Sequence, residues 1–464
     1  MTGISPDIIA VIGAGASGTL VATQLIRHAR RPLHLLLIER RPLIGRGVAY
    51  SMVNIDYLLN TPTDQMSAYA DKSDHFTEWL KQHHDLPPEW EPITACSFVP
   101  RYLHGAYLEA VLEEASTLSK LVTFERIHDE VYTLSPRGNS IGISLKSGQY
   151  LHAHQVILAI GIFPSGNPPV STPEFYDSPR YRSDPWSPEV LANLANDTPV
   201  LLLGSGLTTV DIAIALQAQG HIGPITAVSR RGLLPKAHVP ELLPSIELSH
   251  YPSPMTAHTL VRWIQDEINR TICQNIDWRC VIDTLIPSIQ SLWQELPIEE
   301  KGRFLRHVHP YWDIFRYRIA PATARAFDQI RTAGQFQVYA GRVRSYEEGK
   351  DDVAVTLALR HTRKEIVVRA GLVINCTGLN SNIRSFHHPL IANLLDQGLI
   401  RPGLLGIGMD TTIKGALVNA EGHSSSWLWT LGSLRRGQLW ETTAVSEIRQ
   451  QAEQLARDVL QINE

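Results

Sequence analysis

Cysteine is scarce in this sequence, and its placement argues against two common kinds of site. Cys96, Cys273, Cys280 and Cys376 lie far apart in a chain of 464 residues, and no two of them form a CxxC pair. A disulfide framework, a zinc site and the dithiol chemistry of disulfide reductases are therefore not expected. We expect Cys376 to be a packed core thiol and the protein to reside in the reducing cytoplasm.

Long apolar runs and a strong net charge are also missing. No apolar stretch reaches the roughly 20 residues that span a bilayer. The run Ile8–Ile12 leads directly into glycines, which indicates a strand rather than a signal peptide. The formal net charge is −4, and no block of five or more basic residues occurs. Binding to a membrane or to nucleic acid is therefore not expected.

Histidines occur in pairs, but not at the spacing of metal ligands. Neither His307 and His309 nor His387 and His388 have acids nearby at the spacing that a zinc site requires. We expect all four to be loop or surface residues. The sequence also lacks a nucleophile elbow and an HExxH motif, so no metal site is expected.

What the sequence does contain is a strand, a glycine turn and a helix, twice over. Ile8–Gly18 reads IIAVIGAGASG and Val200–Asp211 reads VLLLGSGLTTVD. Each helix is followed by another apolar strand, Leu33–Glu39 and Ile225–Arg230, which completes the unit of a parallel sheet. A chain of this length needs two or three domains. The sequence therefore predicts an α/β fold with two Rossmann-like dinucleotide-binding domains.

The first glycine turn has the full pattern of a dinucleotide site. Gly13 permits the tight turn, Gly15 lets the backbone approach a pyrophosphate, and Gly18 lets the helix pack on the strand. Glu39 ends the next strand about 20 residues later, where a carboxylate can accept hydrogen bonds from ribose hydroxyls. A purely structural turn would not need that acid, so we expect a nucleotide here.

Later segments favour FAD as this nucleotide. Arg46–Tyr50 and Leu58–Pro62 could reach along a long cofactor, and strands ending in a small-residue turn recur at Val156–Gly161, Val373–Gly378 and Leu428–Gly432. This recurrence resembles the two-dinucleotide flavoproteins of the glutathione-reductase and flavin-monooxygenase type, which implies that the last such strand leads into a helix whose N-terminus points at the flavin. The reduced flavin is anionic, so a helix N-terminus would stabilise it, and here that helix would start within 437–444. The alternative for 437–444 is an ordinary helix start with a threonine cap.

The second glycine turn points to NADPH. Thr209 replaces its third glycine. The segment resembles the NADPH loop of flavin-containing monooxygenases, a GxGx(S/T)xx(E/D) pattern, with Thr208 and Asp211 at the matching positions. The next strand ends in Ser229–Arg231 and not in an acid, and guanidinium groups there can hold a 2′-phosphate. The alternative is that Arg230 and Arg231 are solvated surface charges.

The remaining segments are predicted more simply. Arg101–Ser116 is typical of an exposed amphipathic helix, Leu121–Ile160 of antiparallel strands, and Gln438–Leu460 of one long helix. Leu233–Thr332 has helical spacing and could roof the nicotinamide site. Within it, Arg306–Arg318 alternates arginines with aromatics. That stretch is either an interdomain packing helix or a carboxylate-binding wall of a substrate pocket, with Tyr311, Trp312, Arg316 and Arg318 as candidates.

Four stretches together carry a resemblance over nearly the whole chain: GAGASG, GRGVAYS, LLNTP and LGSLRRGQLWETTAVSEIRQQA. The chain resembles a family of bacterial FAD/NAD(P)-binding proteins and, more distantly, N-hydroxylating and flavin-containing monooxygenases. The linker fingerprint of those monooxygenases is only partly present. Phe175 and Pro185 fit it, whereas Asp177 and Tyr181 stand where glycine and histidine are usual.

The resemblance implies a fold of the glutathione-reductase and flavin-monooxygenase type. Residues 1–165 and 371–464 would form the FAD domain, and 166–370 the NADPH domain, with a helical insertion at about 233–332. The candidate cofactor-binding residues of the FAD domain are Gly13, Gly15, Ala16, Ser17, Gly18, Glu39, Arg40, Arg46, Gly47, Tyr50, Asn60, Val131, Gly161, Gly378, Gly432, Trp440, Glu441 and Thr442. Those on the NADPH side are Gly204, Gly206, Thr208, Thr209, Ser229, Arg230 and Arg231.

The expected activity is that of an FAD-dependent oxidoreductase that NADPH reduces. The resemblance further implies a monooxygenase that forms a C4a-hydroperoxyflavin with O2 and hydroxylates a small amine or amino acid. Two alternatives remain open: an NADPH:acceptor oxidoreductase without oxygen insertion, and a non-catalytic FAD-binding redox sensor. The sequence assigns no catalytic residue, no particular substrate and no oligomeric state.

Overall fold

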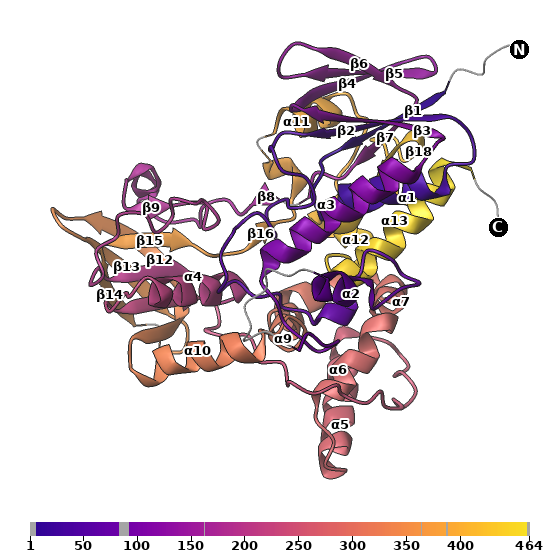
Figure 1. Ribbon diagram of the computed structural model, residues 1–464. Coiled ribbons are helices and arrows are strands. Elements are labelled where there is room, and N and C mark those ends of the chain that lie inside the picture. The colour runs from indigo at the N-terminus through magenta and orange to yellow at the C-terminus, as the bar shows by residue number, and fades with distance from the viewer. Residues whose placement is uncertain (1–5, 83–91, 162, 363, 387, 462–464) are drawn as a thin grey trace, which may run out of the picture.

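The computed structural model describes residues 6–461 apart from 83–91, 162, 363 and 387. Figure 1 shows three lobes, two built on sheets and one of helices. The first sheet has the order β17-β18-β7-β1-β2-β3. Its strands are β1 (Asp7–Ile12), β2 (Leu33–Glu39), β3 (Val122–His128), β7 (Gln155–Leu158), β17 (Ala416–Val418) and β18 (Ser424–Thr430).

β1, the strand that leads into the first glycine turn, lies at the centre of this sheet. β1 pairs in parallel with β2 from Asp7↔Leu33 to Ile12↔Ile38, and with β7 on its other side. Helices α1 (Ala16–His28), α3 (Arg101–Leu118) and α13 (Val445–Val459) pack together, with α1 touching both of the others. An antiparallel sheet of β4 (Val131–Arg137), β5 (Ser140–Leu145) and β6 (Tyr150–Ala153) lies near α11 (Pro389–Asp396), which contacts β4.

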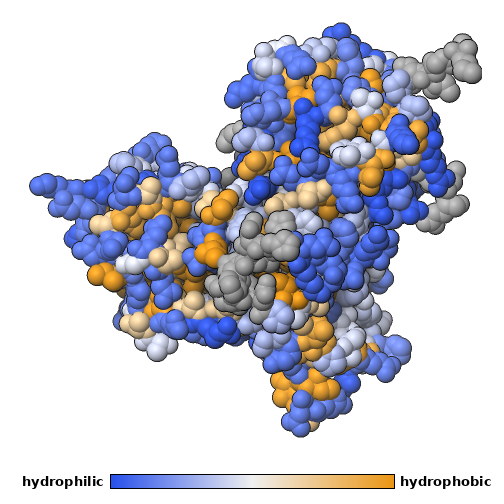
Figure 2. Space-filling view, viewed as in Figure 1, coloured by the Kyte–Doolittle hydropathy of each residue, from blue (hydrophilic) through white to orange (hydrophobic). Residues whose placement is uncertain are grey.

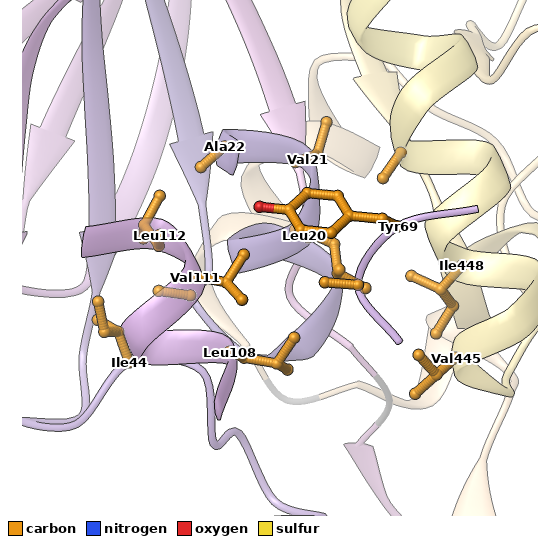
Figure 3. Close-up of a cluster of buried hydrophobic side chains, with 14 of the residues drawn as sticks. Leu20, Val21, Ala22, Ile44, Tyr69, Leu108, Val111, Leu112, Val445 and Ile448 are labelled. Carbon is orange, nitrogen blue, oxygen red and sulfur yellow. The ribbon is translucent and has the colours of Figure 1, made fainter. Parts of the chain in front are cut away.

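The core under the first sheet joins segments far apart in sequence. In Figure 3, Leu20 of α1, Leu108 of α3 and Ile448 of α13 point into one cluster, together with Tyr69. α3 therefore buries one face, including the fully enclosed Tyr107. The prediction of an exposed helix at Arg101–Ser116 was wrong in this respect, because its apolar stripe packs on α1.

The second sheet has the order β14-β13-β12-β11-β10-β15-β9. Its strands are β9 (Tyr181–Arg182), β10 (Val200–Leu203), β11 (Ile225–Ser229), β12 (Phe336–Glu348), β13 (Val353–Leu359), β14 (Glu365–Ala370) and β15 (Leu372–Asn375). β10, β11 and the first half of β12 run parallel, as a nucleotide-binding sheet requires. The helix after the second turn is α4 (Leu207–Ala218).

Two boundaries differ from the predicted ones. β15 pairs with β10, so the chain is still in the second sheet after residue 371. α10 (Pro321–Thr332) packs on α4 and leads into β12, which makes it the crossover helix between two parallel strands. The helical insertion therefore ends before α10, because α10 belongs to the second sheet's own layer.

Two short antiparallel strands carry the chain between the sheets. β8 (Phe163–Pro164) pairs with β16 (Leu379–Asn380). β8 follows the first sheet's β7, and β16 follows the second sheet's β15. The outward and returning segments thus lie side by side where the chain crosses between the two sheets.

The third lobe is the helical insertion, at the bottom of Figure 1. Its helices are α5 (Ala257–Cys273), α6 (Arg279–Leu285), α7 (Ile289–Glu295), α8 (Ile298–Arg303) and α9 (His309–Arg316), with a π-helical turn at Phe304–Val308. Trp263, Trp293 and Trp312 form its core with Trp440 from the C-terminal segment. Figure 2 shows apolar surface on this lobe as well as on the two others.

Two further segments differ from their predictions. β3 and β7 within Leu121–Ile160 join the parallel sheet, and only β4–β6 are purely antiparallel. The predicted helix Gln438–Leu460 is two helices, α12 (Arg436–Leu439) and α13, separated where Trp440 has a φ of 60°. The other short helices are α2 (His75–Lys81), η1 (Thr63–Gln65), η3 (Pro173–Asp177), η4 (Ile286–Ser288), η6 (Ile383–Ser385), η7 (Leu404–Gly406) and η8 (Gly432–Arg435). None of the helices described in the structure is long and apolar enough to cross a membrane.

Candidate cofactor site

A cavity of about 480 Å³ extends from the first glycine turn to the start of α4 at the second turn. Cofactor pockets typically have volumes of about 300–1,000 Å³. Thirteen of the predicted residues line it: Gly13, Gly15, Ala16, Ser17, Glu39, Arg40, Arg46, Gly47, Tyr50, Val131, Gly161, Thr208 and Gly378. The sequence patterns that surround the two turns therefore meet around one space.

The first turn has the backbone shape that its glycines predict. Gly13 has a φ of +96°, and a Cβ there would lie 2.5 Å from the carbonyl oxygen of Ala159. A Cβ on Gly18 would lie 1.8 Å from the carbonyl oxygen of Gly13, which explains the close packing of α1 on β1. A Cβ on Gly15 would lie 3.3 Å from the Cα of Gly47, so two backbone segments approach each other at the cavity wall.

Glu39 is held in place by the turn itself. Its Oε2 accepts a hydrogen bond from the backbone N–H of Ala14 at 2.7 Å, and its Oε1 accepts one from the N–H of Arg41 at 2.9 Å. Each carboxylate oxygen keeps a further lone pair for a hydroxyl donor. On the same wall, Nε of Arg46 is buried with no hydrogen-bond partner among the described residues, which leaves a donor for an anion. These groups fit an adenine dinucleotide.

His388 lies at this cavity, although we expected a surface residue. Its side chain is 11% exposed, and its Nε2 lies 3.4 Å from a carboxylate oxygen of Glu130. Burial lowers the pKa of His388, and the nearby Arg40 lowers it further. The isolated spacing of His388 could not show this, because α11 brings it to the cavity only in the folded chain. His387 lies outside the described residues.

The second turn leaves room for a ligand at one glycine only. Gly204 has a φ of +123°, and a Cβ there would lie 2.3 Å from the carbonyl oxygen of Cys376. A Cβ on Gly206 would meet nothing within 4 Å. Thr209, in place of the third glycine, is fully buried in the first turn of α4. Cys376 is buried and unpaired, as expected of a core thiol.

The predicted arginine pair at the end of β11 is divided. Arg230 is exposed. Arg231 lies 5.1 Å from the ring centre of Tyr311 and donates to the carbonyl oxygen of Arg306 at 3.0 Å, so it contacts the insertion. Ser229 accepts hydrogen bonds from Ser205 and from the N–H of Gly232. Of the two side chains, that of Arg230 is exposed, while that of Arg231 is half-buried against the insertion.

Trp440–Thr442 contacts the insertion and lies outside the cavity lining. The buried carboxylate of Glu441 accepts from Trp312 Nε1 at 2.9 Å and from the Tyr317 hydroxyl at 3.1 Å, and Arg316 Nε lies 3.4 Å away. Trp440 stacks on Trp293 with ring centres 4.8 Å apart.

The residues that follow Trp440–Thr442 in the chain do line the cavity. The hydroxyl of Thr442 donates to the carbonyl oxygen of Gly432, where a Cβ would lie 2.9 Å from Ser17 Oγ. The next residues, Thr443 and Val445, line the cavity at the start of α13. The insertion thus holds the segment from behind, while α13 begins at the cavity.

The arginines and aromatics of Arg306–Arg318 do not converge on an open pocket. The carboxylate that Trp312 and Arg316 contact is the protein's own Glu441, and Arg318 pairs with Asp283. Tyr311 is 46% exposed and faces Arg231. These contacts support the alternative of an interdomain packing helix.

Arg101 was missing from the sequence-based candidates. Its guanidinium donates to both carboxylate oxygens of Asp211, at 2.9 and 3.0 Å, and to Asn60 Oδ1 at 3.3 Å. Trp186, between β9 and β10, lines the cavity and lies beneath Arg101, with 5.8 Å between its ring centre and the guanidinium carbon. Asp211, the acid of the pattern at the second glycine turn, was the one sequence signal that could have prompted a search for a cationic partner.

Comparison with known proteins agrees with this architecture. Residues 10–163 match a family model described as FAD-NAD(P)-binding, and this stretch is a FAD/NAD(P)-binding domain. A comparison with curated protein sequences gives no match. The match ends at β8, where the chain crosses to the second sheet.

Three solved structures share the fold over almost the whole chain. An FAD-bound cadaverine monooxygenase from Erwinia amylovora has a TM-score of 0.68 at 11% identity, covering 98% of this chain and 95% of its own. An ornithine N-hydroxylase from Kutzneria, with reduced FAD, NADP+ and ornithine, has 0.62 at 11%, covering 98% and 99%. A bacillithiol disulfide reductase from Staphylococcus aureus has 0.59 at 12%, covering 99% and 100%. The chain therefore has the fold of two-dinucleotide flavoproteins.

Proposed function

We propose that this chain is an FAD-dependent oxidoreductase that NADPH reduces, and that it acts as a monooxygenase on a small amine or amino acid. The observation that carries the proposal is the cavity that extends from the first glycine turn to the helix after the second, lined by Gly15 at one end and by Thr208 of α4 at the other. Two nucleotides bound at these turns would approach each other within one cavity, as transfer of a hydride requires.

The chain's own residues have distinct tasks in holding the two nucleotides. The turn Gly13–Gly18 and the fixed carboxylate of Glu39 would bind the adenosine diphosphate of FAD, with Arg46 as an anion donor. Gly206 and Thr208 would face the pyrophosphate of NADPH, and Arg230 its 2′-phosphate. FAD supplies the redox chemistry: it accepts a hydride and, once reduced, can react with O2.

Two further groups shape the reacting end of the cavity. α13 begins at its wall with Thr443 and Val445, and the unpaired N–H groups of a helix start favour negative charge there. Trp186, Val445 and Ile448 form apolar wall around it and limit the access of water. The protein's contribution is therefore positioning, electrostatic support and shielding.

Two considerations support oxygen transfer over electron transfer to a disulfide. The solved structures of similar fold include hydroxylases of ornithine and cadaverine. The chain lacks the CxxC pair that dithiol reductases use, and Cys376 is buried. The alternative of an NADPH:acceptor oxidoreductase is favoured by one observation: Trp312 and Arg316 contact Glu441 and so are not available to bind a substrate carboxylate.

Product analysis distinguishes these activities. The purified protein should release FAD on heating and should be reduced anaerobically by NADPH faster than by NADH. In air, one of a panel of diamines and basic amino acids should yield a hydroxylamine in step with NADPH consumption. Peroxide equal to the NADPH consumed with every amine would favour the plain oxidoreductase, and a protein that takes up no FAD would overturn the whole proposal.

A further inference from the structure

One guanidinium joins three segments at the boundary between the two nucleotide turns. Arg101 stands at the start of α3, which packs under the first sheet. Its Nε donates to the carbonyl oxygen of Leu58 at 2.8 Å, and its terminal nitrogens donate to Asn60 and Asp211. The planar fork of arginine can satisfy all of these acceptors at once, which a lysine ammonium cannot do in the same geometry.

Both members of the ion pair are removed from water. The side chains of Arg101 and Asp211 are 11% and 6% exposed. Burial raises the pKa of Asp211, and the adjacent Arg101 opposes that change. A buried ion pair is a poor source of stability because desolvation offsets much of its attraction, but it defines geometry strictly.

The pair links the helix of the second turn to a segment that precedes α3. Asp211 is on α4, three residues after Thr208, which lines the cavity. On the other side, Leu58 and Asn60 belong to the segment that also places Tyr57 in the second sheet's core. Trp186, another cavity residue, packs against both Arg101 and Tyr57.

We propose that Arg101 and Asp211 form a positioning pair that fixes α4 against the segment 58–60, and so sets how the nucleotide at the second turn meets the one at the first. This inference rests on the proposed function, since the relative position of the two nucleotides matters only if a hydride passes between them. Neither side chain lines the cavity, whereas Thr208 of the same helix does, so the pair acts through the placement of α4 and not on the reacting atoms.

The test compares Arg101→Lys and Asp211→Asn with a matched control, Arg180→Lys, in the FAD-loaded protein. Arg180 also donates to a carboxylate, that of Glu348 at 2.8 Å, and to a carbonyl oxygen, that of Lys350, but away from the cavity. Hydrogen exchange, measured without added NADP+, should be about tenfold faster at the amides of 57–60 and of α4 in Arg101→Lys and Asp211→Asn. It should be unchanged there in Arg180→Lys. Asp211→Asn keeps the size of the side chain, so it covers the case in which Arg101→Lys folds poorly.

Kinetics then separate positioning from binding. At saturating NADPH, the limiting rate of flavin reduction should fall about 10- to 100-fold in both variants. The affinity for NADP+ and the FAD content should stay within about threefold of the wild type. A loss confined to NADP+ affinity, or unchanged exchange at 57–60 and α4, would overturn the positioning role. A wild-type protein that NADPH does not reduce would instead overturn the proposed function, while the exchange experiment still decides whether the pair couples the two segments.

Discussion

At the second glycine turn, two neighbouring glycines should respond in opposite ways to the same substitution. Gly206→Ala should change the free energy of unfolding by less than about 0.5 kcal/mol, because its Cβ would meet nothing within 4 Å. It should nevertheless weaken NADP+ roughly tenfold, or about 1.4 kcal/mol, because a pyrophosphate would occupy that space. Denaturant titration and calorimetric titration with NADP+ measure the two effects.

Gly204→Ala is the matched variant at the same turn. It should destabilise the fold by about 1–3 kcal/mol, since φ is +123° and the Cβ would lie 2.3 Å from the carbonyl oxygen of Cys376. Unchanged NADP+ affinity in Gly206→Ala would mean that the nucleotide binds elsewhere.

The two arginines after β11 should also differ from each other. Arg230→Ala should reduce the preference for NADPH over NADH by about 1.5–3 kcal/mol, roughly 10- to 150-fold, if the exposed guanidinium holds the 2′-phosphate. Arg231→Ala should alter that preference little and lower stability instead, because Arg231 contacts Tyr311 and Arg306. Flavin reduction rates with each nucleotide test this, and equal loss in both variants would contradict it.

His104 should make stability depend on pH. It is fully buried, with Nε2 2.8 Å from the carbonyl oxygen of Met66, and burial lowers its pKa from 6.5 to about 4. The unfolded chain therefore binds more protons between pH 6.5 and 4, so the folded state loses stability as the pH falls through that window. At about 1.4 kcal/mol per pKa unit, the loss should be about 3 kcal/mol.

Substitution of this histidine isolates its contribution. His104→Gln should reduce the loss of stability between pH 6.5 and 4 by about 3 kcal/mol in denaturant titrations, while His238 and His388, whose pKa burial also lowers, keep their own contributions. His423→Gln should leave the dependence unchanged, because the His423 side chain is 76% exposed. An identical slope in the wild type and His104→Gln would show that other groups cause the acid sensitivity.

At the scale of elements, the buried carboxylate of Glu441 should contribute strongly to binding the insertion to the C-terminal segment. Glu441→Gln should lower the free energy of unfolding by about 3–5 kcal/mol, because Arg316 would lose the charge of a buried partner 3.4 Å away. Glu421→Gln is the surface control, since its side chain is 77% exposed. A loss below about 1 kcal/mol would indicate that Glu447, 3.7 Å from Arg316, compensates.

Local patterns predicted element types better than element boundaries. The alternation of apolar residues and glycines identified β1, α1, β10 and α4, because each depends on neighbours in sequence. The end of the insertion was misplaced, since α10 has the same helical periodicity whether it belongs to a separate lobe or bridges β11 and β12. The break between α12 and α13 was missed as well. Trp440 has a φ of 60° and is held by stacking on Trp293, a contact that sequence spacing does not reveal.

For the whole molecule, bound FAD should be a large part of the measured stability. Ligand at a hundredfold excess over its Kd stabilises the folded state by about 2.7 kcal/mol. The thermal midpoint should therefore rise with added FAD after the cofactor is stripped. Gly15→Val should lose this response, because its side chain would enter the wall between Gly15 and Gly47. A wild-type midpoint that ignores FAD would contradict assignment of the cavity to this cofactor.

The sequence by itself determined the α/β class and the two glycine turns, and it singled out Glu39, which accepts a hydrogen bond from the first turn. These depend on short-range requirements: Gly13 needs a positive φ, Gly18 needs the absence of a Cβ, and Glu39 needs to end the adjacent strand. Such requirements are written in consecutive residues and so can be recognised without a structure.

Only the tertiary structure decided which side chains share a space. His388 enters the cavity, Arg231 turns to the insertion, and Glu441 is enclosed by Trp312 and Tyr317 instead of facing a cofactor. The Arg101–Asp211 pair joins residues 110 positions apart. The physical reason is the same in each case: a buried charge must find its partner wherever packing brings one, and packing is a property of the whole chain.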